Sequence, residues 1–276
     1  MTTTNQPEEL FHTSLNPTAK TTIVFLHALF CSHLEFTLLT PHLPSHHLLL
    51  IDLPAHSRSR SPNSPFTLAN CAAHVASLIR THAHGGRAHI VGVSAGGFVA
   101  MRLATAHPAL VLSLFVSGAT PLRPWQRFLA ARPRALYPLL AATGAWVPDG
   151  AYAWVTGRLM GLLPHAALRA ESKANFDLGL VRGGYGELAA FTLEEVRALA
   201  GTGVRRLVLA GEVVDDGGMA GAMGRVLREN GSLDSRAVVV EKAQHLWDLQ
   251  FPELFARSVE AWVEGGDLPL ELKTLE

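Results

Sequence analysis

The segment Gly92-Val93-Ser94-Ala95-Gly96 has the residue types of a serine nucleophile held on a tight turn. An apolar run over 88–93 precedes the serine, and a helical pattern over 95–106 follows it. Small flanking residues let the backbone turn sharply and hold the hydroxyl clear of the turn. The N-terminus of the following helix would favour an anion forming there. The bare Gly-x-Ser-x-Gly pattern is weak, but this strand-to-helix context predicts a nucleophile.

His245 is the candidate base for that serine. A hydroxyl needs a base to remove its proton, and the pKa of imidazole lies near neutrality. Among the 14 histidines, His245 is the one between the last expected strand and the last expected helix. Loops that follow parallel strands gather at one edge of the sheet, so Ser94 and His245 should meet there. His27 and His56 also follow strands and remain competitors.

An acid should orient the imidazole and stabilise its charged form. The loop after the apolar run 206–210 carries Glu212, Asp215 and Asp216. Asp215 and Asp216 point in alternate directions, so one of the two should face His245. We favour Asp215, with Asp216 as the second choice and Glu212 as the third.

Acyl transfer also requires two backbone N–H donors for the oxyanion. We expect one from Ala95, directly after the nucleophile. The other should come from the loop after the first strong strand, where Leu29 is the first choice and Phe30 the alternative. Cys31 could be a nucleophile instead, since a thiol needs only a nearby base. Nothing around Cys31 indicates a helix N-terminus or a charge partner.

Short apolar runs alternate with longer amphipathic segments along the chain. The expected strands are 21–26, 47–52, 88–93, 111–116, 206–210 and 236–241. The expected helices are 67–82 with Thr67 as its cap, 95–106, 219–229 and 252–264. Apolar strands separated by helices predict an α/β fold, with a mostly parallel sheet flanked by helices.

The stretch 120–201 interrupts this alternation. It has no convincing strand, its prolines divide it into short helices, and it holds nine of the 20 aromatic residues. We interpret it as a helical cap inserted into a core domain formed by 1–119 and 202–276. Most of its aromatic residues should form its own core, with a few facing a pocket. The expected substrate contacts are Trp125 of the cap and, beside the triad, Phe30 and Trp247.

These motifs together resemble the α/β-hydrolase family with a helical cap. The segment 25–29 is similar to the family's strand-His-Gly oxyanion loop, and 52–59 to its Asp-x-Pro-Gly-His-Gly-x-Ser segment. The elbow at 92–96 and the order Ser, Asp, His also match. The resemblance covers roughly 21–264 and implies the α/β-hydrolase fold, with its parallel sheet and a Ser-His-Asp triad.

Several positions depart from the family pattern. Ala28, Ala55 and Ser57 stand where the family has glycine. A Cβ at residue 28 restricts positive φ there, so the geometry of the oxyanion loop follows less directly from the family pattern. The acid loop is one residue longer than usual, which leaves Asp215 and Asp216 open. The N-terminal hairpin is short, with only 9–14 available for it.

Within this family, a serine at the elbow implies attack on a carbonyl, whereas an aspartate implies epoxide hydrolysis or dehalogenation. We expect a serine hydrolase that forms an acyl-enzyme on an ester or lactone, or next on a thioester. The aromatic residues of the cap and its low charge favour a small lipophilic substrate. The chain also resembles the cap-bearing hydrolases of secondary metabolism and aromatic degradation. The alternatives are a C–C bond hydrolase or lyase and a ligand-binding, non-catalytic member. A basic patch near the start of the cap is either a carboxylate or phosphate site or a solvated helix face; its members are Arg123, Arg127, Arg132 and Arg134.

Composition excludes several other classes. The 23 basic and 23 acidic residues balance, and no basic cluster indicates nucleic acid. No apolar run approaches the ~18 residues of a membrane span, and the polar segment 1–9 lacks a signal-peptide core, so we expect a cytoplasmic enzyme. Oligomeric state cannot be read from the chain.

No cofactor or metal is expected. The clusters His46-His47 and His82-Ala-His84 lack cysteine or carboxylate partners at ligand spacing. The pairs Gly183-Gly184 and Gly217-Gly218 read as turns rather than phosphate-binding loops.

Overall fold

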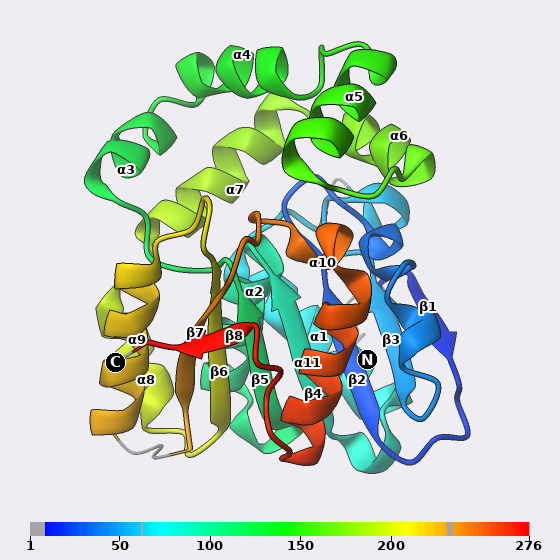
Figure 1. Cartoon of the computed structure of the whole chain (residues 1–276), viewed down its shortest axis with the longest axis vertical. Helices are drawn as coiled ribbons and strands as arrows, with labels where there is room; N and C mark the ends of the chain where they lie inside the picture. The colour runs from blue at the N-terminus through cyan, green and yellow to red at the C-terminus, as the bar shows by residue number, and fades with distance from the viewer. Residues whose placement is uncertain (1–8, 62, 231–233, 276) are drawn as a thin grey trace, which may run out of the picture.

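The computed structural model describes residues 9–61, 63–230 and 234–275, so all but the last residue of the polar segment 1–9 lies outside it. Its centre is a sheet with strand order β1-β3-β2-β4-β5-β6-β7-β8 (Figure 1). The strands are β1 (His12–Leu15), β2 (Thr22–Leu26), β3 (His47–Ile51), β4 (Ala88–Val93), β5 (Val111–Ser117), β6 (Arg205–Gly211), β7 (Arg236–Val240) and β8 (Leu272–Thr274).

Strands β2 to β7 pair in parallel, and β1 and β8 add antiparallel edges. The α/β fold expected from the sequence is therefore confirmed, and each expected strand lies within one residue of its observed bounds. Strand β1 lies partly within 9–14, the segment available for a short N-terminal hairpin, whereas β8 was not predicted. Both edge strands are short and partly polar, and each forms through pairing with a longer neighbour.

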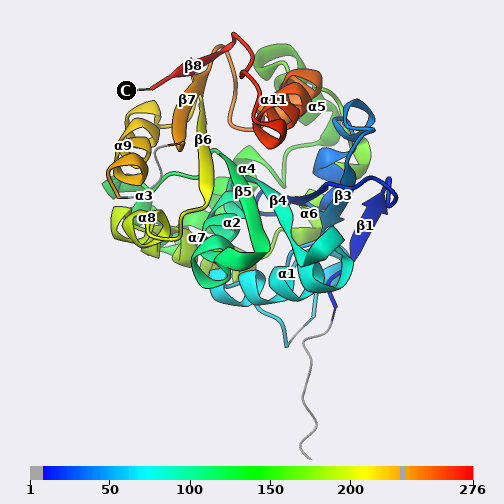
Figure 2. The same ribbon diagram turned by 90° about the horizontal axis from the view of Figure 1, so that it is seen from below.

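Helices cover both faces of the sheet, as the view from below shows (Figure 2). One face packs against α1 (Leu68–His82), α2 (Ala95–Ala106), α8 (Leu193–Ala200) and α9 (Gly217–Glu229). The other packs against α10 (Trp247–Gln250) and α11 (Pro252–Glu264). The Thr67 side chain accepts a hydrogen bond from the Asn70 N–H, as a helix cap does. With helices on both faces, β2 and β3 are buried along their whole length.

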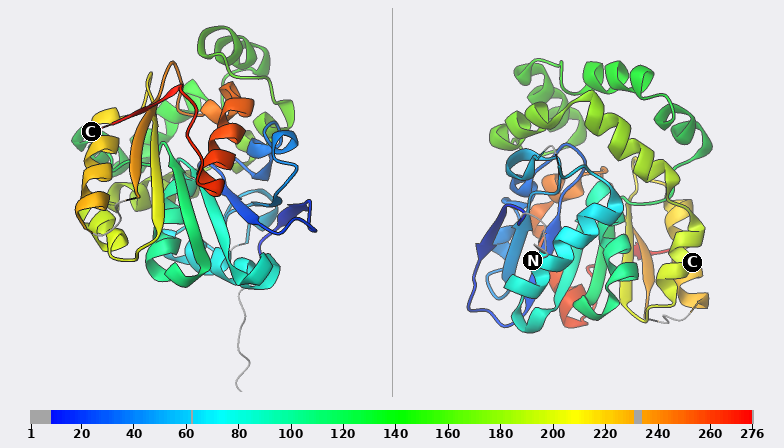
Figure 3. Two further views of the ribbon diagram at one scale, coloured as in Figure 1. Left: turned by 60° about the horizontal axis from the view of Figure 1, so that its bottom comes forward. Right: turned by 180° about the vertical axis from the view of Figure 1, so that it is seen from behind.

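A layer of helices lies across the end of the sheet at which the strands from β2 to β6 finish (Figures 1 and 3). It contains α3 (Pro124–Ala130), α4 (Pro133–Thr143), α5 (Asp149–Met160), α6 (Ala166–Asn175) and α7 (Leu178–Ala190), and these five helices, with the segments that join them, are called the cap below. Proline occupies the first position of α3 and α4, where a missing N–H costs no hydrogen bond. Within the expected insertion 120–201, α8 instead packs beside the sheet against α2 and α9.

Two glycine pairs expected as turns lie in helices. Gly183 and Gly184 are inside α7, and Gly217 and Gly218 open α9. Burial of the other residues of α7 overrides the low helix propensity of glycine. No helix in the described part of the chain has the length and apolar character needed to cross a bilayer.

Candidate active site

Ser94 occupies a strained corner between β4 and α2. Its backbone has φ 51° and ψ −117°, which a residue with a side chain rarely adopts. Its N–H donates to the Ser117 carbonyl at 2.7 Å, which fixes the corner to β5. A Cβ on Gly92 or Gly96 would overlap backbone atoms, so both glycines are required for the turn to close. The corner presents the Ser94 hydroxyl to a pocket under the cap.

His245 and Asp215 meet in the same pocket. The His245 Nδ1 lies 2.5 Å from Asp215 Oδ1, and the second oxygen of Asp215 accepts the Gly211 N–H at 2.8 Å. The Asp215 side chain is 7% exposed and the His245 ring 36%. Glycine at position 118, with φ 64°, lets the backbone pass directly beneath the ring.

The charge on Asp215 controls the ionisation of His245. Desolvation by the surrounding protein alone would lower the pKa of His245. The hydrogen bond and charge of Asp215, with a contribution from Asp248, outweigh it and raise the pKa above its usual 6.5. In the described residues no hydrogen bond joins the ring to the Ser94 hydroxyl, a contact that commonly tightens only when substrate binds.

The other two acids of the loop have different partners. Asp216 accepts the Met219 N–H at the start of α9 and pairs with Arg123 at 2.7 Å. Glu212 accepts the Lys242 N–H at 2.7 Å. Asp215 is therefore the acid that contacts His245.

The competing histidines His27 and His56 are fully buried connectors. His27 Nε2 accepts the Leu53 N–H at 3.0 Å, which ties the loop after β2 to the loop after β3. Burial lowers the pKa of His27 to about 4 and that of His56 to about 3, so both are neutral. Neither lies in the pocket of Ser94.

The loop after β2 offers one free amide beside that pocket. The Ala28 N–H donates to Glu35 Oε2 at 2.7 Å, and the Phe30 N–H donates to His56 Nε2 at 3.1 Å. In the described residues no acceptor takes the N–H of Leu29 or that of Ala95. The alternative donor Phe30 is therefore occupied, and Leu29 and Ala95 remain.

The glycine substitutions in the second motif leave strained backbone. Ala55 has φ 65° and Ser57 φ 42°, so both keep the positive φ that glycine adopts easily. Ala28 has no positive φ, and its side chain causes no such strain. Asn175 holds Ser57 in place, because its amide accepts the Ser57 N–H at 2.7 Å and donates to the Ser57 Oγ at 2.9 Å.

Two adjacent cavities lie between the cap and the sheet edge. The first, of about 360 Å³, is lined by Ser94, Asp215, His245, Leu29 and Trp125, among others. The second, of about 530 Å³, shares Leu29 and His245 with it and extends along Phe30 and apolar residues of the cap. Trp125 lines the first cavity and Phe30 the second, so both remain candidates for substrate contact.

Trp247 does not contact either cavity. Its side chain is fully buried, its indole N–H donates to Ser117 Oγ at 2.8 Å, and it packs on Phe115 and Phe255. The expectation of a substrate contact was wrong, because the side chain of the second residue after His245 turns into the core rather than toward the cap.

A buried pair of acids below the second cavity escaped the sequence analysis. Glu35 and Asp248 are fully buried next to each other, and burial raises the pKa of both. Cys31 lies beside them, and burial with the Glu35 charge raises the pKa of its thiol well above the usual value. The thiol is thus protonated and a poor nucleophile. Only the fold brings Glu35 and Asp248 together, so no local pattern could reveal them.

Comparisons with known proteins agree with this architecture. The alpha/beta hydrolase family model matches residues 23–258. A protein of Gibberella zeae strain PH-1 described as an AB hydrolase superfamily protein is 30% identical over 272 residues, 96% of this chain and 88% of that protein.

Two solved structures share the fold. A hydrolase from Pseudomonas aeruginosa PA01 aligns with a TM-score of 0.66 at 22% identity, covering 91% of this chain and 93% of that one. The enol-lactonase from Burkholderia xenovorans LB400 aligns with a TM-score of 0.68 at 18% identity, covering 92% and 96%. The chain therefore belongs to the alpha/beta hydrolase family, as the resemblance of its motifs implied.

Proposed function

We propose that this chain is a serine hydrolase that cleaves an ester or lactone of a small lipophilic substrate, with a thioester as the next candidate. The observation that carries the proposal is the 2.5 Å contact of Asp215 with His245 in the pocket that also contains Ser94. A serine, a histidine and an aspartate so placed have the roles of nucleophile, base and orienting acid.

In the proposed reaction the Ser94 Oγ attacks the substrate carbonyl while His245 Nε2 accepts its proton. The N–H groups of Leu29 and Ala95 stabilise the oxyanion. The protonated His245 then gives its proton to the leaving oxygen, and an ester bond to Ser94 remains. Water, deprotonated by His245, attacks that ester and releases the acid and the free serine.

Asp215 acts on this cycle through His245. Its contact at Nδ1 holds the ring in the tautomer whose Nε2 is free to accept a proton. Its negative charge also stabilises the imidazolium that exists while the acyl-enzyme forms and breaks.

The lining of the cavities favours a lipophilic substrate. Beyond His245 the larger cavity is bounded mainly by apolar side chains, including Leu140, Val147, Val155, Met160 and Phe176. An uncharged acyl or alkyl group would displace water from these surfaces at a gain of about 25 cal/mol per Å² buried.

The basic patch at the start of the cap gives little reason to expect a charged substrate. Arg123 pairs with Asp216, and Arg127 donates to the carbonyls of Leu122 and Phe191. Arg132 donates to the Phe128 carbonyl and stacks on the Phe128 ring. These guanidinium groups have partners within the protein, which favours the interpretation as a helix face.

A C–C bond hydrolase or lyase using the same three residues is the second candidate. A non-catalytic, ligand-binding member is the third, and the close contact of Asp215 with His245 argues against it.

A panel of esters, lactones and thioesters tests the proposal with the wild type beside Ser94→Ala. We expect turnover of several esters by the wild type and a loss of about 10³-fold or more in the variant. Mass spectrometry of the wild type mixed with a good substrate should detect the added acyl group on Ser94. Equal activity of the two proteins, or no turnover of any acyl substrate, would reject the assignment.

A further inference from the structure

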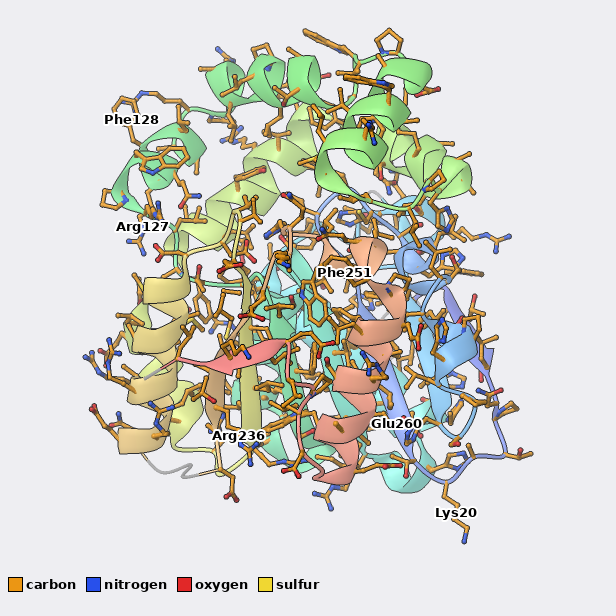
Figure 4. The ribbon with its side chains drawn as sticks, viewed as in Figure 1. Lys20, Arg127, Phe128, Arg236, Phe251 and Glu260 are labelled. Carbon is orange, nitrogen blue, oxygen red and sulfur yellow. The ribbon has the colours of Figure 1, made fainter. Side chains whose placement is uncertain are left out.

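A second group of polar side chains lies at the opposite end of the sheet from Ser94. His46 belongs to the turn that leads into β3, and it faces Glu260 and Glu264 in the last part of α11. The distance from His46 Nε2 to the nearest carboxylate oxygen is 3.9 Å for each glutamate. One ligand atom from each residue lies within 4.8 Å of the other two. Figure 4 labels Glu260 on α11, well away from the cap.

The imidazole ring of His46 has no hydrogen-bond partner in the described part of the chain. The residue is 4% exposed. A buried polar group without a partner is costly, and such groups are rare in native proteins. The ring is therefore both inaccessible to bulk water and directed at two carboxylates that are too distant for a hydrogen bond.

We propose that His46, Glu260 and Glu264 bind a divalent transition-metal ion, and Zn²⁺ is the ion with which to test it. Imidazole nitrogen and carboxylate oxygen are common zinc ligands, at bonds of about 2.0–2.2 Å. Tetrahedral coordination at that length separates ligand atoms by roughly 3.4 Å. A shift of about half an ångström in two glutamate side chains would close the observed 3.9 Å to that value.

The glutamates are free to make this movement. Their side chains are 38% and 60% exposed for Glu260 and Glu264, so neither is locked by packing. The carboxylates are one helical turn apart on the same face of α11, which ends at Glu264. The C-terminal end of a helix carries partial negative charge and favours a cation. Solvent would supply the remaining ligand on the exposed side.

The ion would act on stability and not on the reaction. It would join the last long helix to the turn before β3, two segments that are distant along the chain. His46 lies before the first residue of β3, whereas Ser94 follows the last residue of β4, a strand that runs in the same direction. An ion that binds only the folded state raises the free energy of unfolding.

The sequence analysis noted the pair His46-His47 but found no partner residues for it and therefore predicted no metal site. His47, the other half of that pair, is satisfied by Ser14 Oγ at 2.9 Å and Thr22 Oγ1 at 3.1 Å. The expectation that the histidine clusters lack carboxylate partners held only for ligands close in sequence. In the fold, His46 gains two glutamates from α11, and His82 gains Glu9.

The test titrates Zn²⁺ into tag-free, chelator-treated full-length protein and follows heat release and thermal unfolding. All proteins carry His82→Ala, so that the second group, formed by Glu9, His12 and His82, does not contribute. We expect one bound equivalent and a rise in Tm, both lost in Glu260→Gln/Glu264→Gln. Glu253→Gln, an exposed change in the first turn of the same helix, is the control and should keep both.

Co²⁺ provides a second readout. The protein with intact glutamates should give the visible absorption of a four-coordinate cobalt site, and the double variant should not. Equal Zn²⁺ binding with and without the two glutamates, or no binding in either protein, would overturn the proposal. Either outcome would mean that the three side chains are neighbours that do not share a metal ion. Because neither readout uses turnover, the result is independent of the proposed hydrolase activity.

Discussion

Asp215 joins His245 to the end of β6. One oxygen of its carboxylate lies 2.5 Å from the His245 ring, and the other accepts the N–H of Gly211, the last residue of β6. Asp215 therefore fixes the position of the His245 ring relative to the end of β6. Asp216, the next residue, instead caps the start of α9 and forms an ion pair with Arg123.

Replacing each aspartate separately should distinguish these roles. Asp215→Asn keeps the side-chain shape but removes the charge and favours the wrong ring tautomer, so kcat/KM for an ester should fall by about 10³–10⁴-fold. Asp216→Asn keeps an oxygen that can cap α9, and we expect a change of less than about tenfold. A larger loss in Asp216→Asn than in Asp215→Asn would move the acid by one position.

The pH dependence of kcat/KM should report the ionisation of His245. Only the neutral ring accepts the Ser94 proton, and its pKa is raised mainly by Asp215 against the effect of desolvation. Activity should therefore fall as the pH drops, with a midpoint above 6.5. In Asp215→Asn the residual activity should show that midpoint at a lower pH. A midpoint that is the same in both proteins would show that another group titrates.

Gly184 of α7 packs against the side chain of Leu29, so a substitution there can perturb the loop that carries Leu29. A methyl group at Gly184 would lie 2.7 Å from Leu29 Cδ1, whereas one at Gly186 would meet nothing within 4 Å. Gly184→Ala should displace Leu29 and lower kcat for ester hydrolysis. Gly186→Ala, on the same helix, should leave kcat unchanged and stabilise the protein by about 0.5–1 kcal/mol. Wild-type kcat in Gly184→Ala, with only a lower Tm, would show that the Leu29 side chain yields without moving its backbone N–H.

The two strained positions of the second motif should respond differently to glycine. Ala55→Gly relieves a positive φ, so the free energy of unfolding measured with urea should rise by about 1 kcal/mol. Ser57→Gly relieves a similar strain but removes the hydroxyl that accepts from Asn175, so its gain should be smaller or absent. Destabilisation in Ala55→Gly would contradict this account.

The buried acid Asp248 should make stability depend on pH. Burial raises its pKa to about 7, so between about pH 4 and 7 the folded protein binds a proton that the unfolded chain releases. The stability contributed by that proton is present at low pH and is lost as the pH rises through 7. Between pH 5 and pH 8, the free energy of unfolding of Asp248→Asn, measured by urea titration, should rise relative to that of the wild type by on the order of 2 kcal/mol. A constant difference between the two proteins over this range would show that Asp248 is already ionised at pH 5.

Sequence patterns predicted those parts of the molecule that local periodicity determines. The six parallel strands could be placed because each is a run of apolar residues that both layers of helices cover. Ser94 and His245 could be assigned to one edge, since both follow strands of one parallel sheet. The choice between Asp215 and Asp216 required coordinates, because one step along a loop changes which side chain faces the ring.

Features that depend on distant segments could not be predicted. Trp247 follows His245 closely in sequence, yet its side chain enters the core, because Ser117 and Phe115 offer a hydrogen bond and a packing surface there. Glu35 and Asp248 are isolated acids in the sequence and neighbours only in the fold. The same holds for His46, whose carboxylate neighbours come from α11 near the other end of the chain.

The distribution of the five tryptophans has a practical consequence. Trp125, Trp146 and Trp154 belong to the cap and are 59–62% exposed. Trp247 of α10 and Trp262 of α11 belong to the sheet with its covering helices, here called the sheet layer, and are 0% and 3% exposed. A soluble collisional quencher such as acrylamide will therefore extinguish mainly the emission of the cap, and the remaining blue-shifted signal will come from the sheet layer. The native protein thus carries separate fluorescent reporters for the cap and for the helices that cover the sheet, and a change in either can be followed without attaching a dye.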